Sequence, residues 1–209
     1  MNALVYDLEI VRGIPKRGED PVPGIDYCEG WGDHENMGIS VLCAYDYAED
    51  RYRVFCKDNW ADFVALTAFR RPLVGFNSIR FDNAVIRHGP EEGSLGLDIQ
   101  ESYCYDVLRE VWRAAGLGPN FSPKTHGGFR LDDMARVNLD RQKTGEGALA
   151  PVQWQRGEVG AVIDYCMEDV RLTKLLFDFA LERRPLRSPV DGRELMLRHP
   201  SDVVGQLEA

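Results

Sequence analysis

The sequence predicts a single α/β domain in which a mixed sheet is covered by helices. An apolar, partly β-branched run at residues 3–6 indicates a buried strand, and residues 158–181 place apolar side chains at the 3.6-residue period of a helix. Strand-like and helix-like segments alternate between these two. A chain of 209 residues, 44% of them hydrophobic, is long enough to bury one sizeable core.

The composition narrows the possible classes of protein. The charged fraction of 28%, without any long single-residue tract, argues against disorder, and no apolar stretch approaches the roughly 20 residues of a membrane span. The first ten residues lack a basic start, so we expect no secretory signal, a cytoplasmic location and no membrane partner. The five cysteines are scattered without metal-type spacing and are interpreted as reduced apolar residues.

The first half of the chain is expected to form the sheet. The strand at 3–6 suits a central position, because its residues are apolar on both faces. Residues 39–45 and 52–56 are predicted to form a hairpin that pairs with it. A Gly- and Pro-rich loop of open role, residues 11–36, precedes this hairpin. The other expected elements are a helix at 58–70 with Asp58 as N-cap, a strand at 73–76, a helix at 78–88, a strand at 102–105 and a helix from 107 that ends at Gly116.

The second half is expected to be looser before its long helix. Residues 117–130 and 140–157 are rich in Gly, Pro, Lys and Arg, with a short helix near 131–138 between them. The helix at 158–181 should pack on the sheet. Residues 183–209 contain three prolines and an Asp-Gly pair suited to a hairpin turn, so we predict a domain over 1–182 followed by a C-terminal tail with a short hairpin.

Asp7 and Glu9 are the first candidate functional residues. They are two residues apart on the predicted central strand, so both side chains point to one face, with Cα atoms about 6–7 Å apart. Two like charges taken out of water are costly unless a cation lies between them. Mg²⁺ suits such a pair, because it binds through one or two carboxylates and keeps several waters. Alternatively, the pair lies just past the end of the strand and is solvated.

Three later residues complete the candidate set. Asp82 follows a predicted strand-to-helix turn, where it is alternatively a helix-start Asp favoured by the helix dipole. Tyr165 and Asp169 are four residues apart and therefore neighbours on one face of the long helix. A tyrosine there is usually a core residue, but an Asp beside the apolar stripe has no ordinary structural reason to face a sheet.

In combination, these residues resemble the three ordered motifs of the DEDD 3′→5′ exonucleases, which have a ribonuclease H-like fold. The motifs are Asp7-x-Glu9, Asn77-x-x-x-Phe81-Asp82 and Tyr165-x-x-x-Asp169. The resemblance spans residues 3–180, and its third motif is that of the tyrosine subtype (DEDDy) found in the proofreading domains of DNA polymerases. The histidine subtype would have His where Asp164 stands. Residues 143–166 also resemble stand-alone exonucleases of bacteria and phages.

The resemblance implies a mixed five-stranded sheet flanked by helices and a site that holds two Mg²⁺ or Mn²⁺ ions. In the family, the counterpart of Asp7 bridges both metals, while those of Glu9 and Asp169 complete the site of the cation that carries the nucleophile. Asp82 would support the second metal, largely through water. Tyr165 would orient the attacking water, because a phenol with a pKa near 10 is a poor base at neutral pH.

The predicted substrate is the 3′ end of DNA, single-stranded or at a frayed duplex. The net charge of −9 does not by itself indicate a nucleic-acid partner, although metal ions held by carboxylates can face phosphate. Asn77, Phe81 and Lys143 are candidate substrate-binding residues. The candidate phosphate contacts are Lys124, Arg130, Arg136, Arg141 and Lys143, and the candidates for base stacking, each alternatively a core residue, are Phe76, Phe81 and Trp154.

Two other functions remain open at this point. One is an exonuclease of the same superfamily that trims RNA, since no residue reports on recognition of a 2′-hydroxyl. The other is a catalytically silent module that binds nucleic acid or protein. No polymerase domain is present in this chain, so proofreading in cis is not available, and a polymerase or helicase is a candidate partner in trans.

Overall fold

The computed structural model describes residues 1–16, 18–88, 95–141 and 147–204. Its main sheet has five strands in the order β3-β2-β1-β4-β5. The strands are β1 (Leu4–Ile10), β2 (Ile39–Asp46), β3 (Arg51–Phe55), β4 (Leu73–Gly75) and β5 (Cys104–Asp106). Because β1 pairs antiparallel with β2 and parallel with β4, the sheet is mixed. The predicted α/β class is therefore confirmed, with the first strand at the centre.

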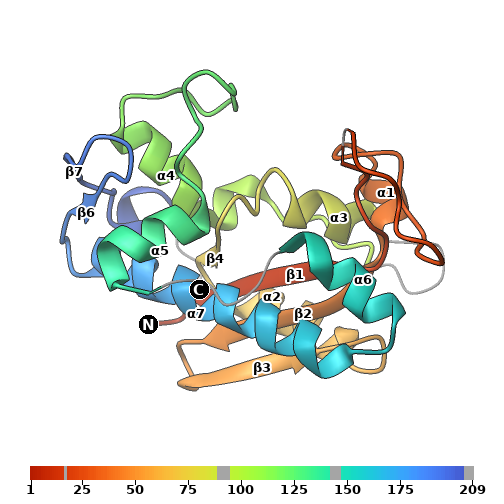
Figure 1. The fold of residues 1–209 in the computed structure, drawn as a ribbon. Helices are drawn as coiled ribbons and strands as arrows, with labels where there is room; N and C mark the ends of the chain where they lie inside the picture. Colours follow the sequence, from red (N-terminus) through yellow and green to blue (C-terminus); the bar gives the residue numbers. More distant parts are fainter. Residues whose placement is uncertain (17, 89–94, 142–146, 205–209) are drawn as a thin grey trace.

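Helices cover both faces of this sheet (Figure 1). The long helix α7 (Val159–Leu181) packs against β1 and β2 on one face. Residues of α2 (Trp60–Phe69) and α3 (Asp82–His88) pack in the core on the other face. The remaining helices are α1 (His34–Met37), α4 (Val107–Ala114), α5 (Leu131–Leu139) and α6 (Ala150–Gln155), with short 3₁₀ helices at Glu101–Tyr103, Gly147–Leu149 and Pro200–Asp202.

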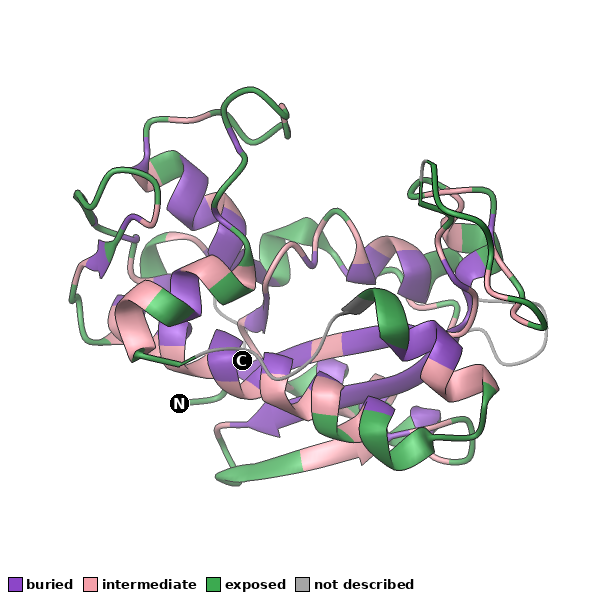
Figure 2. Cartoon of the chain, viewed as in Figure 1, coloured by how far each residue is buried: buried purple, intermediate pink, exposed green. Residues whose placement is uncertain are grey.

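The central strand is buried on both faces, as Figure 2 shows. Successive side chains of a strand point to opposite faces, and β1 follows this rule. Val5 belongs to the core under α7, whereas Leu4 and Tyr6 belong to the core on the α2 and α3 side. This double burial explains the uninterrupted apolar run of residues 3–6.

The structure corrects several predicted boundaries. Strand β1 continues to Ile10 and pairs with β2 as far as its end, so Asp7 and Glu9 lie inside the strand. The alternative that placed them beyond it is therefore wrong. The helix predicted from residue 78 begins only at Asp82, and the one predicted from Asp58 begins at Trp60, after Asn59. Local propensity does not fix where a chain leaves a sheet and enters a helix.

The predicted loop at 11–36 contains the short helix α1, and the predicted loose segment at 140–157 contains α6. Gln155 of α6 holds the base of the loop. Its side-chain oxygen accepts a hydrogen bond from the Asp26 N–H at 2.7 Å, and its amide nitrogen donates to the Val11 carbonyl at 2.8 Å. The loop is thus tied to a helix more than a hundred positions later in the chain.

The segment after α7 forms a small antiparallel pair, β6 (Leu186–Arg187) with β7 (Glu194–Leu195). Gly192 lies in the turn between them with a φ of 76°, a left-handed conformation that glycine adopts without strain. Leu186 and Leu195 are fully buried in the core under α7. This segment therefore packs on the rest of the domain.

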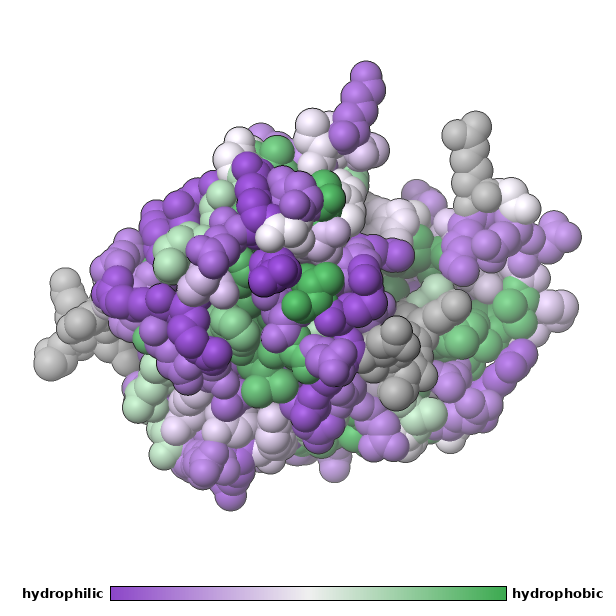
Figure 3. Space-filling model, turned by 60° about the vertical axis from the view of Figure 1, so that its left-hand side comes forward, coloured by the Kyte–Doolittle hydropathy of each residue, from purple (hydrophilic) through white to green (hydrophobic). Residues whose placement is uncertain are grey.

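Hydrophilic side chains cover much of the molecular face drawn in Figure 3, with hydrophobic side chains gathered in its middle. Apolar atoms contribute roughly 55–60% of the accessible surface of folded proteins, so exposed hydrophobic side chains on this face are expected. Among the described residues, no helix has the length and apolarity that crossing a bilayer requires.

Candidate metal centre

Three carboxylates from opposite ends of the chain meet at the C-terminal half of β1. Asp7 and Glu9 come from this strand and Asp169 comes from α7, and each offers an oxygen within 4.8 Å of the others. Glu9 and Asp169 are buried and Asp7 is half-buried. At an effective dielectric constant of 20, two unit charges this close repel by about 3 kcal/mol. A divalent cation would turn this repulsion into attraction, so the residues fit such an ion.

A cysteine of α7 contacts β1 beside the acidic cluster. Cys166 lies on the same helix as Asp169 and is fully buried. Its thiol donates a hydrogen bond to the backbone carbonyl of Asp7 at 3.4 Å, and its sulfur lies 3.7 Å from an Asp7 carboxylate oxygen. Burial raises the pKa of this thiol, so it stays neutral beside the carboxylates. A small side chain here lets the helix bring Asp169 to the strand.

Asp82 reaches the same strand from the start of α3. One of its carboxylate oxygens accepts a hydrogen bond from the N–H of Leu8, the residue between Asp7 and Glu9, at 3.2 Å. The Tyr6 hydroxyl donates a second bond to the Asn83 side chain, which also ties α3 to β1. Asp82 is not one of the three groups within 4.8 Å of one another, so it lies at the edge of the cluster.

The buried position of Asp82 changes its titration. Burial raises its pKa to about 7, and the negative charges of Asp106 and Asp169 act in the same direction. The N–H groups of Asp82 itself and of Leu8 act against this rise. A nearby divalent cation would favour the ionised form, as it does for carboxylates at metal sites.

Asp106, which was not among the predicted site residues, positions the turn before Asp82. Its buried carboxylate accepts hydrogen bonds from the N–H groups of Asn77 at 3.0 Å and Ile79 at 3.1 Å. It also caps α4 by accepting from the N–H of Leu108 at 3.0 Å. Asn77 has a φ of 67°, a left-handed conformation that Asn tolerates better than most residues. An Asp between a strand and a helix is typical of an N-cap, and this was the available signal.

Tyr165 lies one helical turn before Asp169 and is half-buried. Burial raises its pKa far above the ordinary value, and the charges of Asp169, Glu9 and Asp7 add to the rise. The phenol is therefore close enough to interact electrostatically with all three carboxylates. It remains protonated at neutral pH and can act as a hydrogen-bond donor.

The predicted substrate-binding residues differ in their exposure to solvent and in whether they lie within the described residues. Phe81 is half-buried next to Asp82, whereas Lys143 lies outside the described residues. Four of the predicted phosphate contacts are exposed on the described part of the chain: Lys124, Arg130, Arg136 and Arg141. Two of these are paired, Arg136 with Asp133 and Arg141 with Glu168. Phe76 packs partly buried against the core.

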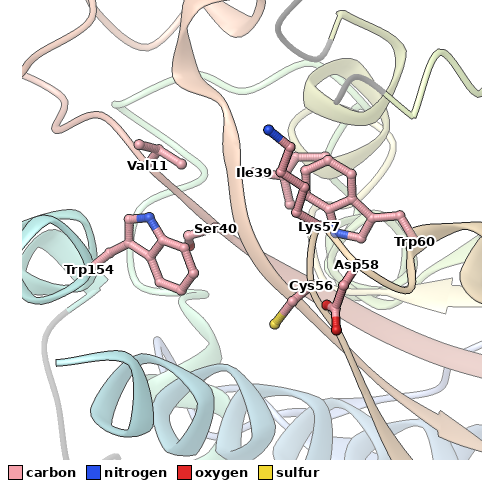
Figure 4. Close-up of a pocket in the computed structure, with 8 residues that line it drawn as sticks. All are labelled: Val11, Ile39, Ser40, Cys56, Lys57, Asp58, Trp60 and Trp154. Carbon is pink, nitrogen blue, oxygen red and sulfur yellow. The ribbon is translucent and has the colours of Figure 1, made fainter. Parts of the chain in front are cut away.

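Trp154 lines a cavity of about 540 Å³ beyond the end of β1 (Figure 4). Trp60 lies on the opposite side of this cavity, and Lys57 contributes a cationic side chain. Ser40, another lining residue, donates a hydrogen bond from its hydroxyl to the backbone carbonyl of Glu9 at 2.9 Å. None of the candidate carboxylates lines the cavity, so it lies beside the acidic cluster and not within it.

The sheet order and the helices on both faces define a ribonuclease H-like fold, as predicted. No family model and no curated protein sequence matches this chain. Its structure is similar to that of the family B DNA polymerase from the hyperthermophilic archaeon Pyrobaculum calidifontis, with a TM-score of 0.52 and 19% sequence identity. The similarity covers 91% of this chain and 26% of the polymerase chain. At this identity the comparison shows a shared fold.

Proposed function

We propose that this chain is a metal-dependent 3′→5′ exonuclease of the DEDD superfamily, tyrosine subtype. It hydrolyses phosphodiester bonds at the 3′ end of DNA, single-stranded or at a frayed duplex. The observation that carries the proposal is the meeting of Asp7, Glu9 and Asp169 within 4.8 Å, with Tyr165 one turn away on the same helix as Asp169. The fold shared with a DNA polymerase supports DNA as the substrate class.

In this proposal, Asp7, Glu9 and Asp169 hold the cations, and Asp82 supports the second one from the edge of the cluster. Two Mg²⁺ or Mn²⁺ ions, when bound, would stabilise the attacking and departing oxygens of an in-line displacement at phosphorus. The repulsion among the carboxylates favours ions of charge +2, and oxygen ligands favour hard cations.

The protein's own part in the reaction is positioning. Tyr165 donates a hydrogen bond that orients the attacking water, because its raised pKa makes the phenol unsuitable as a base. Phe81 directly precedes Asp82, so it can stack the 3′-terminal base close to the carboxylates. Asn77 and Lys143 are proposed to contact the same strand. A polymerase or helicase is proposed as a partner in trans.

The test uses DNA and RNA strands labelled at the 3′ or the 5′ end, incubated with the protein and Mg²⁺ or Mn²⁺. A chelator and the Asp7→Ala variant serve as controls, and both should abolish turnover. Stepwise loss from the 3′ end of DNA is the expected result. Degradation of RNA alone would support the RNA-trimming alternative, internal cuts would indicate an endonuclease, and no cleavage with either metal would favour a silent binding module.

A further inference from the structure

The loop between β1 and β2 carries Trp31, which at 73% exposure is the most exposed aromatic side chain among the described residues. A single exposed apolar residue is ordinary, so exposure alone indicates no function. Trp31, however, contacts the ring of Phe81, with the centroids 6.0 Å apart and the planes at 59°. His34 of the same loop also contacts Phe81, at 5.9 Å. The loop thus meets the residue that precedes Asp82.

The position of this loop is fixed by backbone contacts. Gly13 and Tyr27 form a bridge, in which the Gly13 N–H donates to the Asp26 carbonyl and the Cys28 N–H donates to the Gly13 carbonyl, both at 2.9 Å. At its far end, α1 packs against α3. Trp31 is therefore held beside Phe81 by the fold, and little ordering is needed before it can bind a ligand.

The residue before Phe81 reaches a second loop. The guanidinium carbon of Arg80 lies 5.4 Å from the ring centre of Phe121, which is 46% exposed in the segment between α4 and α5. Figure 1 shows this segment and the loop at 11–36 on different sides of the chain that leads into α3. Asp82 therefore follows a pair of residues whose side chains contact aromatic rings from two loops.

One cationic side chain, that of Arg80, lies next to these rings. Arg80 and His88 are exposed, and they are close enough to His34 to affect its titration. Partial burial lowers the pKa of His34 first, and the positive charges of His88 and Arg80 lower it further, against the opposing charge of Asp33. An arginine next to exposed aromatic rings is a combination that proteins use to bind single-stranded nucleic acid.

We propose that Trp31 and Phe81 form a stacking platform that binds an unpaired nucleobase of the substrate strand, with Arg80 facing its phosphate. The platform rests on the proposed exonuclease function and assigns the loop at 11–36 the task of holding the strand at the acidic cluster. Stacking on an indole accepts any base, so binding should tolerate all sequences. Bases within a duplex are already stacked on each other, so the platform should bind an unpaired end in preference to a blunt one.

The experiment compares the wild-type chain with Trp31→Ala and with Phe69→Ala. Phe69 is a matched control, because it is 67% exposed but lies at the end of α2 and has no ring contact with Phe81. Binding of a single-stranded DNA oligonucleotide with 2-aminopurine near its 3′ end is measured by fluorescence, with Ca²⁺ in place of Mg²⁺. Trp31→Ala should weaken binding by about 5- to 150-fold, while Phe69→Ala should bind like the wild type.

Two further measurements separate stacking from a general structural effect. The first is thermal unfolding with and without Mn²⁺, which involves no base, and Trp31→Ala should keep the metal-induced rise in melting temperature of the wild type. An oligonucleotide with an abasic unit at the stacked position should bind the wild type and Trp31→Ala equally weakly.

The platform and the exonuclease proposal fail in different ways. Oligonucleotide binding by Trp31→Ala equal to that of the wild type would overturn the platform, even if the chain degrades DNA. Loss of both the oligonucleotide binding and the metal-induced rise in melting temperature would also overturn it, because it would show a distorted site. Binding that depends on Trp31, without cleavage by the wild type in Mg²⁺ or Mn²⁺, would support the platform and refute the exonuclease.

Discussion

Replacement of Asp7 by Asn tests the acidic cluster most directly. The variant keeps the size of the side chain and removes one charge that lies within 4.8 Å of Glu9 and Asp169. Without metal it loses two mutual repulsions, each about 3 kcal/mol at an effective dielectric constant of 20. We therefore expect the metal-free variant to unfold at no lower a temperature than the wild type.

The same change should weaken metal binding. The Asp7 carboxylate attracts each bound ion at least as strongly as it repels a neighbouring carboxylate, by about 3 kcal/mol. Loss of this attraction corresponds to a metal affinity about 100-fold lower. At a metal concentration about 100 times the wild-type dissociation constant, binding stabilises the wild type by about 2.7 kcal/mol. For a chain of 209 residues this raises the melting temperature by about 5–10 °C, against about 1 °C for Asp7→Asn.

The assay is thermal unfolding with Mg²⁺ or Mn²⁺ and with a chelator, followed by circular dichroism. Asp62→Asn is the control, because Asp62 is an exposed carboxylate on α2 away from the cluster, and it should keep the wild-type shift. A metal-induced shift in Asp7→Asn equal to that of the wild type would refute the assignment of Asp7 as a ligand. A metal-free variant that fails to fold would refute the reasoning about repulsion.

Three further predictions concern single residues. Tyr165→Phe should keep the metal-induced rise in melting temperature but lower turnover about 10- to 100-fold. This is the effect expected from the loss of one hydrogen bond to a charged or polar group at the site. An unchanged rate would remove Tyr165 from the mechanism. Asp106→Asn should lower the melting temperature by several degrees and also slow turnover. An amide cannot accept hydrogen bonds from all the N–H groups that the carboxylate accepts, and each unmade bond costs about 1–3 kcal/mol. An unchanged melting temperature would contradict the positioning role of Asp106. Asp46 is fully buried, and although burial raises its pKa, the hydrogen bond and charge of Arg70 outweigh this and hold the pKa below its ordinary value. Because the pKa of Asp46 is lower in the folded state than in the unfolded state, its ionised form stabilises the native state at pH values above the unfolded pKa of about 3.9. The difference in unfolding free energy between the wild type and Asp46→Asn should therefore be largest at neutral pH and shrink as the pH falls below about 4. Urea titrations at a series of pH values would measure this difference.

Much of the secondary structure could be predicted from the sequence because its signals are local. The helix predicted at 158–181 is observed at Val159–Leu181, since an apolar stripe over 23 residues is a strong periodic signal. The hairpin of β2 and β3 was also predicted, from two strand-like runs around a polar turn. The first turn of α3 was predicted too early, because the turn at residues 76–81 is held by Asp106 from a different part of the chain.

The sequence by itself determined which candidate side chains lie on the same face of a strand or helix. Asp7 and Glu9 are two positions apart in a strand, and Tyr165 and Asp169 are four apart in a helix, so backbone geometry alone directs each pair. The distance between the two pairs is not a local property. It depends on the packing of α7 against β1, which comes from burial of apolar surface, a force without direction that no short motif specifies.

Only the tertiary structure decided how the long loop and the second motif are placed. The loop at 11–36 has no periodic pattern. It docks on α6 through Gln155, and on the turn before α3 through the contact of Trp31 with Phe81. Asp106 likewise acquires its role from N–H groups about 30 positions earlier in the chain. Hydrogen bonds and ring contacts between distant segments depend on how the packed core places those segments relative to one another. The spacing of residues in the sequence therefore does not predict them.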